Sequence, residues 1–349
     1  MQFSLPRRQR ILYVGTFFAG DTSRYRFHAL GRLNQEVIPF DPFSYPPKGW
    51  LAQRLKYRYP VGPLVARVNR ELVKAVQNLK PNVVWFDKPT DFTPETMRTI
   101  RGSGAKIVFY VQDSPFGPRK DGCWLQFFKT FQMADLHCLF RDADIPRYRE
   151  RQLPFIKIML SFDPLVHFPP PPEFSDTERN RQVSYIGSPY EQRPQFLLKL
   201  AREHQLPVFV NGFRWERVLG AKERTQVSVG GFLPDADYRL GIWGSKINLS
   251  FLTHDNEEDI GHKTVEVAAC GGFLMAIRAP GHQAIFEEDL EAVFFSSVEE
   301  CADKCRFYLN RPDLREAIAA RGHQRAVQCG YDNDTQLARV LNRLDGQDA

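Results

Sequence analysis

The sequence predicts an α/β protein made of two doubly wound halves, and three observations favour this fold class. Short apolar runs alternate with amphipathic or polar segments over residues 10–140, and the alternation resumes at residue 183. Runs such as VVWF and KIVFYV have no polar face, as expected for parallel strands that are covered by helices on both sides. A segment with four consecutive prolines at 169–172 separates the two alternations and is typical of a semi-rigid linker.

The first half contains a regular succession of expected elements. We expect strands at 10–15, 36–40, 82–86, 106–111 and 135–140, and helices at 25–33, 60–79, 93–102 and 124–134. Pro39 weakens the second strand, because proline has no N–H to donate to a sheet.

The second half repeats this succession. We expect strands at 183–187, 208–211, 227–229, 247–251 and 273–277, and helices at 194–204, 236–241, 264–270, 298–309, 313–328 and 334–344. The pair Gly271–Gly272 is expected to end the short helix at 264–270 with a left-handed C-cap.

The formal net charge is +6, and it is unevenly distributed. Residues 1–70 contain 12 Lys and Arg against 3 Asp and Glu. Such a region can meet an anionic membrane surface, a phosphorylated acceptor or nucleic acid, or it can be a solvated face with no partner. The sequence contains no zinc finger, RNA-recognition signature or basic amphipathic helix, so we expect no nucleic-acid partner.

Two features bear on the location of the protein. No window contains 18 uninterrupted apolar residues, so we expect no membrane span. The six cysteines form no C-x-x-C pair, which favours reduced thiols in a cytosolic protein. We therefore expect a cytoplasmic protein, with peripheral contact at the inner face of the membrane as an alternative for the basic N-terminal region.

Polar loops follow the expected strands of the first half, at the edge where open α/β sheets bind ligands. The loop GTFFAGDTSRYR supplies Gly15, Thr16 and Arg24, but it contains neither G-x-G-x-x-G nor G-x-x-x-x-G-K-[ST]. We expect it to face an acceptor or a phosphate, with ordinary turn chemistry as the alternative. Lys88 and Asp113 follow two later strands, and Asp113 is a candidate general base toward an acceptor hydroxyl. The alternative is that Asp113 caps a helix or a turn.

The second half offers groups that suit phosphate. Gly187 and Ser188 follow a strand, and a glycine permits a ligand to approach the backbone closely. Arg193 lies just before a helix and Lys246 opens a strand, and such cations bind phosphate oxygens unless they are ordinary surface residues. Three further candidates for donor binding are Asn211, Gly212 and Asn248.

The stretch 245–280 carries two acids that are separated by seven residues, Glu258 and Glu266. Glu266 lies in a short helix among small residues, where a carboxylate can accept both hydroxyls of a ribose. Glu258 lies in the preceding loop and can accept sugar hydroxyls. The first amides of the helix, near Lys263 and Thr264, can bind phosphate. This arrangement predicts a sugar-nucleotide site, although either glutamate alone can simply complement a helix N-terminus.

Residues 183–332 resemble the group 1 glycosyltransferases of GT-B fold, closest to the CgeB-like (spore-maturation-protein-like) branch. The resemblance is carried by VSYIGSPYEQRPQFL, WGSKINLSF, HKTVEVAACGGFLMA, PGHQAIFEEDLEAVFFSSVEECADKCRFYL and RGHQRAVQCGYDNDTQLARVL. It implies two Rossmann-like domains with an interdomain cleft: an acceptor domain at 1–165 and a nucleotide-sugar donor domain at 166–330. It also implies that a C-terminal helix at 331–349 crosses back to the first domain.

The resemblance further implies a hexosyltransferase-like transfer from a nucleotide-diphosphate sugar, with retention and without a metal. By position, Glu266 matches the glutamate that holds the ribose, and Glu258 matches the first glutamate of an E-x7-E pair, which faces the donor sugar. Arg193 and Lys246 fall near the cations that bind the diphosphate. Lys263 stands where many relatives have an arginine. If the enzyme inverts instead, Asp113 is the candidate base.

Two other functions remain open on the sequence alone. The loop after Gly187 departs from the family pattern, which is compatible with a nucleotide-sugar-binding scaffold that has lost catalysis. A sugar-nucleotide epimerase is the second alternative. The sequence does not specify the donor sugar, the base or the acceptor, for which a glycan, a lipid-linked glycan, a protein and a small molecule are all candidates. The spacings of His254, His262 and His282 match no zinc pattern, so we expect no metal and no other cofactor.

Overall fold

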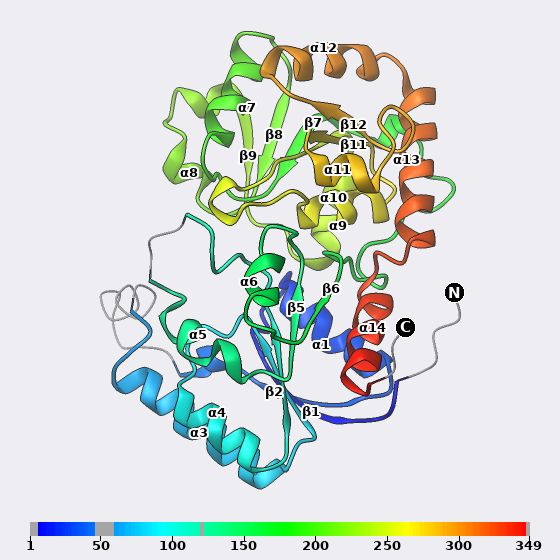
Figure 1. Ribbon diagram of the computed structural model, residues 1–349. Coiled ribbons are helices and arrows are strands. Elements are labelled where there is room, and N and C mark those ends of the chain that lie inside the picture. Colours follow the sequence, from blue (N-terminus) through cyan, green and yellow to red (C-terminus); the bar gives the residue numbers. More distant parts are fainter. Residues whose placement is uncertain (1–5, 46–58, 119–121, 347–349) are drawn as a thin grey trace. The chain divides into compact units, whose positions relative to one another are not determined.

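A computed structural model describes residues 6–45, 59–118 and 122–346, which fall into two compact units (Figure 1). The first unit extends to Met159 and also includes Asp255–Glu257 and the final helix. The second unit consists of Leu160–His254 and Glu258–Asp332. The chain therefore leaves the first unit a few residues before the boundary at 165 that the sequence suggested.

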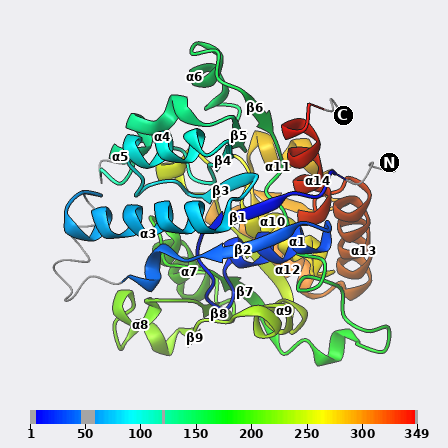
Figure 2. The ribbon, with the colours of Figure 1, turned by 90° about the horizontal axis from the view of Figure 1, so that it is seen from below.

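The first unit contains a six-stranded parallel sheet in the order β2-β1-β3-β4-β5-β6. Its strands are β1 (Arg10–Val14), β2 (Glu36–Phe40), β3 (Val83–Asp87), β4 (Lys106–Tyr110), β5 (Leu136–Leu139) and β6 (Phe155–Lys157). Its helices are α1 (Thr22–Arg32), α3 (Pro63–Leu79), α4 (Pro94–Gly102), α5 (Leu125–Thr130), α6 (Ile145–Arg149) and α14 (Asn333–Leu344). The helices α3 and α4 pack side by side (Figure 2).

The second unit also contains a six-stranded parallel sheet, in the order β12-β11-β10-β7-β8-β9. Its strands are β7 (Arg181–Ile186), β8 (Val208–Asn211), β9 (Val227–Gly230), β10 (Ser245–Ser250), β11 (Leu274–Ile277) and β12 (Val293–Phe295). Its helices are α7 (Arg193–Arg202), α8 (Trp215–Val218), α9 (Asp235–Trp243), α10 (His262–Ala269), α11 (Pro280–Ile285), α12 (Val298–Leu309) and α13 (Pro312–Gln328).

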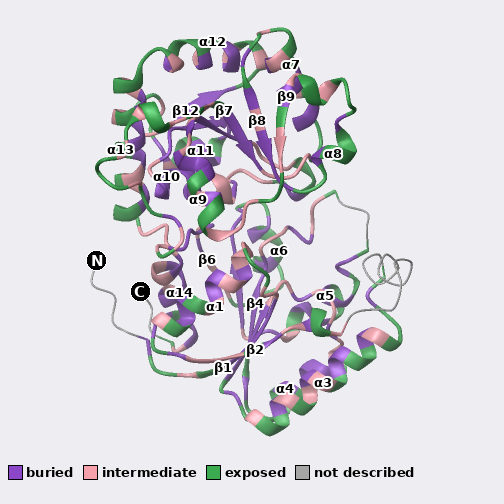
Figure 3. Cartoon of the chain, turned by 180° about the vertical axis from the view of Figure 1, so that it is seen from behind, coloured by how far each residue is buried: buried purple, intermediate pink, exposed green. Residues whose placement is uncertain are grey.

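Most strands line the interior of their unit, as the burial colours of Figure 3 show, whereas β2 and β6 are only partly buried. In β1, the four residues from Ile11 to Val14 are each exposed by at most 1%. Strands that are buried on both faces need apolar side chains at every position, which explains the continuous apolar runs of the sequence. Within the described residues, no helix combines the length and the apolar character that crossing a bilayer requires.

The observed elements differ from the expected ones in two informative ways. The first helix begins at Thr22 rather than at 25, because the Asp21 side chain caps it by accepting a hydrogen bond from the Ser23 N–H (3.1 Å). Pro39 is accommodated because β2 is an edge strand, which pairs only with β1 in the described sheet.

Each sheet has one topological switch point, where successive strands are added first on one side and then on the other. The strand β1 connects to β2 on one side, whereas its neighbour β3 connects to β4 on the other. In the second sheet, β7 leads to β8 and its neighbour β10 leads to β11 in the opposite direction. Open α/β sheets bind ligands outside the carboxyl ends of the strands at such a switch point. A ligand site is therefore expected at the loops that follow β7 and β10.

Candidate functional site

Glu266 lies on α10, the helix that follows β10, and it is 5% exposed. The Tyr238 hydroxyl on α9 donates a hydrogen bond to its Oε2 atom (2.7 Å). Burial opposes ionisation, but the charges of His167, Lys263 and His262 and the bond from Tyr238 lower the pKa of Glu266 below its usual value. The site thus holds an ionised carboxylate in a largely dry environment. Neither Tyr238 nor His167 could be predicted from the sequence, since neither belongs to a local motif.

Lys263 lies one turn before Glu266 and next to Gly187, the residue that follows β7. A Cβ on Gly187 would lie 2.7 Å from Lys263 Cε and 2.4 Å from the Tyr185 hydroxyl. Only glycine therefore fits at this position without displacing the lysine. The Lys263 Nζ lies 5.6 Å from the centre of the Tyr238 ring, and burial lowers the pKa of Lys263 despite the attraction of Glu266. The structure thus brings three predicted residues together at the second switch point: Gly187, Lys263 and Glu266.

The helix α10 ends at the two glycines, and Gly271 has the predicted left-handed conformation, with φ of 64°. The Gly271 N–H bonds to the Ala268 carbonyl (2.9 Å), and the Gly272 N–H bonds to the Val267 carbonyl (3.0 Å). These two bonds form a Schellman motif. A Cβ on Gly272 would lie 2.6 Å from Ile242, so close packing also requires the second glycine.

The Thr264 side chain is engaged within the protein. Its Oγ1 lies 3.1 Å from Ser250 Oγ and 2.9 Å from His282 Nε2. The His282 Nδ1 lies 2.7 Å from the Ile277 carbonyl, which can only accept, so Nδ1 donates and Nε2 accepts from Thr264. This network joins the end of β10 to α10 and α11.

Arg193 begins α7 and is 8% exposed. Its guanidinium donates to the Leu252 carbonyl (3.1 Å) and to the Thr253 hydroxyl (2.7 Å), both in the loop after β10. It also donates to the Tyr185 hydroxyl (2.8 Å). Arg193 thus links the loops that follow β7 and β10. Ser188 takes part in this link through its carbonyl, which lies 3.5 Å from the Arg193 Nη1.

Glu258 lies in the loop after β10 and folds back on it. Its Oε2 accepts from the Thr253 N–H (2.8 Å), and its own N–H donates to the Thr253 carbonyl (3.2 Å). The carboxylate is partly exposed. Glu258, which was predicted to face the donor sugar, thus joins the two ends of a turn within the loop between β10 and α10.

Asn211 and Gly212 follow β8, beside the loop after β7. The Asn211 side chain donates to the Gly231 carbonyl (3.2 Å) and accepts from Arg181 (3.0 Å). Gly212 has φ of 145°, and a Cβ there would lie 2.3 Å from the Gly187 carbonyl oxygen. Two neighbouring loops of the carboxyl edge thus touch through glycine backbones.

Two predicted donor-binding residues, Lys246 and Asn248, lie away from the loops at the carboxyl edge of the second sheet. Lys246 is the second residue of β10, at the amino end of the strand, and its Nζ lies 3.7 Å from Asp176 Oδ2. Asn248 is 3% exposed in the middle of β10, where its side chain donates to the Ile242 carbonyl (3.4 Å). Proximity in sequence to the acidic loop suggested both residues, but the length of the strand carries Lys246 to the opposite edge.

In the first unit, the switch point is occupied by a buried ion pair. Arg26 Nε and Nη2 donate to the two carboxylate oxygens of Asp87 (2.7 and 3.0 Å), and both side chains are at most 6% exposed. The Tyr13 hydroxyl also donates to Asp87 (2.6 Å), and burial and the Asp87 charge raise the pKa of Tyr13. Sequence reasoning missed Arg26, since a single arginine within a helix resembles any surface residue.

Of the predicted acceptor-side residues, Gly15 lies next to this pair. A Cβ on Gly15 would lie 3.2 Å from the Cβ of Asp87. The Thr16 hydroxyl bonds to Asp21, whereas Arg24 lies partly exposed on α1.

Lys88 and Asp113 form an ion pair with each other after β3 and β4, and their side chains are 35% and 19% exposed. Lys88 has a left-handed backbone, with φ of 63°, which is uncommon outside glycine. The carboxyl edge of the first sheet therefore brings the predicted residues Lys88 and Asp113 together as a partly accessible pair of opposite charges.

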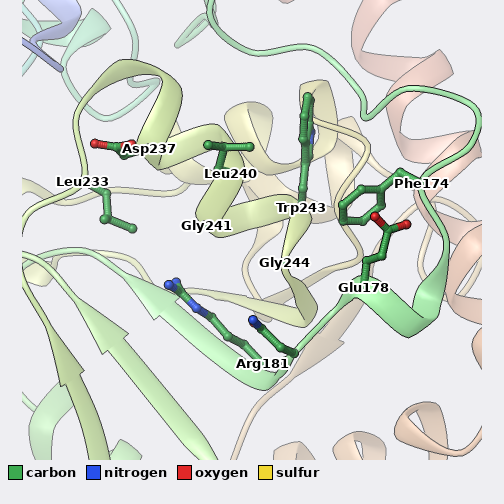
Figure 4. A pocket seen from close by; sticks show the side chains of 10 residues that line it. Phe174, Glu178, Arg181, Leu233, Asp237, Leu240, Gly241, Trp243 and Gly244 are labelled. Carbon is green, nitrogen blue, oxygen red and sulfur yellow. The ribbon is translucent and has the colours of Figure 1, made fainter.

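A pocket of about 340 Å³ lies in the second unit at the other end of its strands (Figure 4). Arg181 opens β7 and Gly244 immediately precedes β10, so both mark the amino edge of the sheet. The helix α9 contributes Leu240 and Trp243 to the lining. No residue that the sequence predicts for the site lines this pocket, which is therefore separate from it.

The described part of the chain contains no group of three or more His, Cys, Asp or Glu that could hold a metal ion. His282 is engaged with Thr264 and Ile277, and His254 lies 2.9 Å from Glu191 Oε2. The histidines at 254 and 282 are thus in protein contacts of their own.

Comparison with solved structures supports the fold. HepE of Anabaena in complex with UDP-glucose is 16% identical, with a TM-score of 0.65, over 96% of this chain and 100% of that chain. Sucrose-phosphate synthase from Thermosynechococcus elongatus is 12% identical, with a TM-score of 0.69, over 97% and 100%. The α,α-trehalose 6-phosphate synthase from Burkholderia multivorans is 12% identical, with a TM-score of 0.62, over 97% and 98%. The predicted GT-B fold with two Rossmann-like domains is confirmed.

Comparison of sequences supports the enzyme class. No curated protein matches the chain. Residues 191–342 match the model of a family described as glycosyl transferase-like. The matched region includes α10 with Glu266 and Lys263, together with the loop that carries Glu258. This matched region, less than half of the chain, is thus similar to glycosyl transferases, in line with the predicted enzyme class.

Proposed function

We propose that the protein transfers a sugar from a nucleoside-diphosphate sugar, with UDP-sugars as the first candidates, to a hydroxyl of an acceptor. The observation that carries this proposal is the buried, ionised Glu266 beside Lys263, which packs against Gly187 at the switch point of the second sheet. The UDP and UDP-glucose complexes of the similar HepE structures support the choice of nucleotide.

The proposed roles follow from charge. A ribose carries two adjacent hydroxyl donors, and the carboxylate of Glu266 offers two acceptors in a dry environment. Cleavage of the bond to the sugar builds negative charge on the departing diphosphate. Lys263 and the first amides of α10 would stabilise that charge, with Arg193 holding the surrounding loops in place. Gly187 lets the diphosphate approach the backbone.

Glu258 is the proposed contact to the donor sugar, because its partly exposed carboxylate lies in the loop that leads to α10. We propose retention at the anomeric carbon and no requirement for a metal, since Lys263 and α10 already supply positive potential. The proposed acceptor side consists of Gly15, Thr16, Arg24 and the Lys88–Asp113 pair. Asp113 is the base if the enzyme inverts. Membership of the CgeB-like branch remains part of this proposal.

A binding and turnover experiment tests the proposal. UDP, CDP, GDP and ADP are screened by calorimetry, and donors built on the nucleotide that binds are then assayed for hydrolysis and transfer. We expect Glu258→Ala to reduce turnover about 100-fold and to leave the nucleotide Kd nearly unchanged, because it removes a contact to the sugar alone. Glu257→Ala, next to it and exposed, serves as the matched control.

The outcomes separate the remaining alternatives. Absence of both nucleotide binding and donor consumption would overturn the proposal. Tight binding without turnover on any acceptor favours a scaffold, and conversion of the donor sugar without an acceptor favours an epimerase. NMR of the product's anomeric proton decides between retention and inversion, and addition of EDTA tests independence from metals.

We also propose that the first unit contacts an anionic membrane surface. The exposed side of α3 carries Arg67, Arg70 and Lys74, in line with the excess of cations over residues 1–70. Sedimentation with vesicles of phosphatidylglycerol, compared with vesicles of phosphatidylcholine, tests this contact. Equal recovery with both lipids would exclude it.

A further inference from the structure

Two phenylalanines of the second unit stack on each other in contact with solvent. The ring centres of Phe213 and Phe232 lie 4.2 Å apart, and the ring planes are inclined by 16°. The residues are 54% and 37% exposed. The other near-parallel ring pairs among the described residues are buried, such as His282 with Phe294, whose centres are 6.0 Å apart. The pair thus offers planar apolar surface to solvent.

The two rings lie at the carboxyl ends of adjacent strands. Phe213 follows β8 and Phe232 follows β9, and the loops are joined by a hydrogen bond from the Gly212 N–H to the Gly231 carbonyl (3.1 Å). Gly212 also packs directly against the Gly187 carbonyl, where a Cβ would lie within 2.3 Å. The pair therefore borders the loop to which the proposed diphosphate-binding residues belong.

The second of these loops also leads to the proposed ribose contact. Three residues after Phe232 the chain enters α9, and the Tyr238 hydroxyl of that helix bonds to Glu266 (2.7 Å). From β10 to β8 and β9 the distance across the sheet is two to three strand spacings, about 10–14 Å. A ligand whose ribose is held by Glu266 can therefore extend one end toward the two phenylalanines.

We propose that Phe213 and Phe232 form the platform on which the base of the nucleotide stacks. This inference rests on the proposed function and names the part of the donor that these loops bind. A base has a large apolar face, and stacking on an aromatic ring buries it without a requirement for particular hydrogen bonds. The rings already cover one face of each other, so the base lies on an outer face of the pair and extends the stack.

The double variant Phe213→Ala/Phe232→Ala tests the platform. We expect its Kd for UDP to be about 5- to 150-fold higher than that of the wild type, which corresponds to the usual contribution of one base stacked on aromatic rings. The Kd for inorganic pyrophosphate, which has no base, is expected to stay unchanged. Phe232→Trp retains a stacking surface, so it is expected to keep the UDP affinity and to show quenching of the new fluorophore on binding.

Phe307→Ala is the matched control, because Phe307 is 46% exposed on α12, away from these loops. It is expected to leave the UDP affinity unchanged. If the wild type binds UDP and the double variant binds it equally well, the platform is wrong while the proposed function stands. If the wild type binds none of UDP, CDP, GDP and ADP, both the platform and the proposed function are contradicted. Circular dichroism confirms that each variant is folded, which is expected since both rings lie at the surface.

Discussion

The two units share a six-stranded parallel sheet with one switch point, but they use a buried carboxylate there in different ways. In the first unit, Asp87 has both oxygens engaged by Arg26 and a further bond from Tyr13. In the second unit, Glu266 is bonded by Tyr238 and lies one helical turn after Lys263, which itself packs against Gly187. A bidentate arginine saturates a carboxylate, whereas a tyrosine and a neighbouring lysine leave an electrostatic environment that suits a ligand. The buried carboxylate near the switch point thus has a structural role in the first unit and, we propose, a binding role in the second.

Loss of the Asp87 charge is expected to have the largest effect on stability. Asp87→Asn leaves Arg26 buried without its counter-charge, which costs about 3–5 kcal/mol of unfolding free energy. Urea denaturation measures this. Asp142→Asn, which breaks the exposed pair with Lys157, is the control and is expected to cost at most about 1 kcal/mol. Equal effects of the two changes would show that the buried pair is not a structural element of the first unit.

The first unit buries a second ionisable group, His137, and this predicts a pH dependence of stability. Burial among Phe109, Phe131 and Tyr148 lowers the pKa of His137 to about 3, from an ordinary value of 6.5. Between these values the unfolded chain binds the proton and the folded chain does not. The stabilisation is therefore complete above pH 6.5 and is lost toward pH 3, at about 1.4 kcal/mol per pH unit.

His137→Phe removes this titration. Urea denaturation at a series of pH values is expected to show a shallower loss of stability for the variant below pH 6.5 than for the wild type. Any constant offset from the larger ring does not affect the comparison of slopes. Parallel curves would mean that His137 is protonated in the folded protein.

In the second unit, Lys263→Ala is expected to weaken UDP binding about 10- to 100-fold, because a hydrogen bond to a charged group contributes about 1.5–3 kcal/mol. Lys263→Arg keeps the charge and is expected to retain most of the affinity. Calorimetry with UDP measures both. Full affinity in the alanine variant would remove Lys263 from the site and would make the two switch points more alike than we infer.

The smallest effect is expected for Lys246→Ala. Its ammonium pairs with Asp176 at the amino edge of the second sheet, so the UDP affinity is expected to change by no more than about twofold. The same titrations measure it. A loss comparable to that of Lys263→Ala would place the ligand at the edge opposite to the one we propose.

Most strands and long helices could be predicted, because their patterns persist over enough residues. The apolar runs of β1, β3 and β4 and the helical spacing of α3 all correspond to observed elements. The short elements α6, β6, α8, α11 and β12 were not predicted. They contain three to six residues, too few for a period to be visible, and their conformation depends on the packing around them.

The site could be predicted only where its residues share a local motif. Glu266, Lys263 and the glycines after α10 lie within one stretch, and the structure keeps them together. Tyr238, which bonds to Glu266 from another helix, left no trace in the sequence pattern. Lys246 shows the opposite error, because a residue near the motif in sequence lies at the far end of its strand.

The placement of α14 has a consequence for the order in which the protein is made. This helix belongs to the first unit, where Arg32 pairs with Asp334 (2.6 Å) and Lys106 donates to the Leu344 carbonyl (2.6 Å). A ribosome completes all of the second unit before it adds α14. The first unit, although it begins the chain, therefore waits with an uncovered apolar surface until the last helix emerges, whereas the second unit can close earlier.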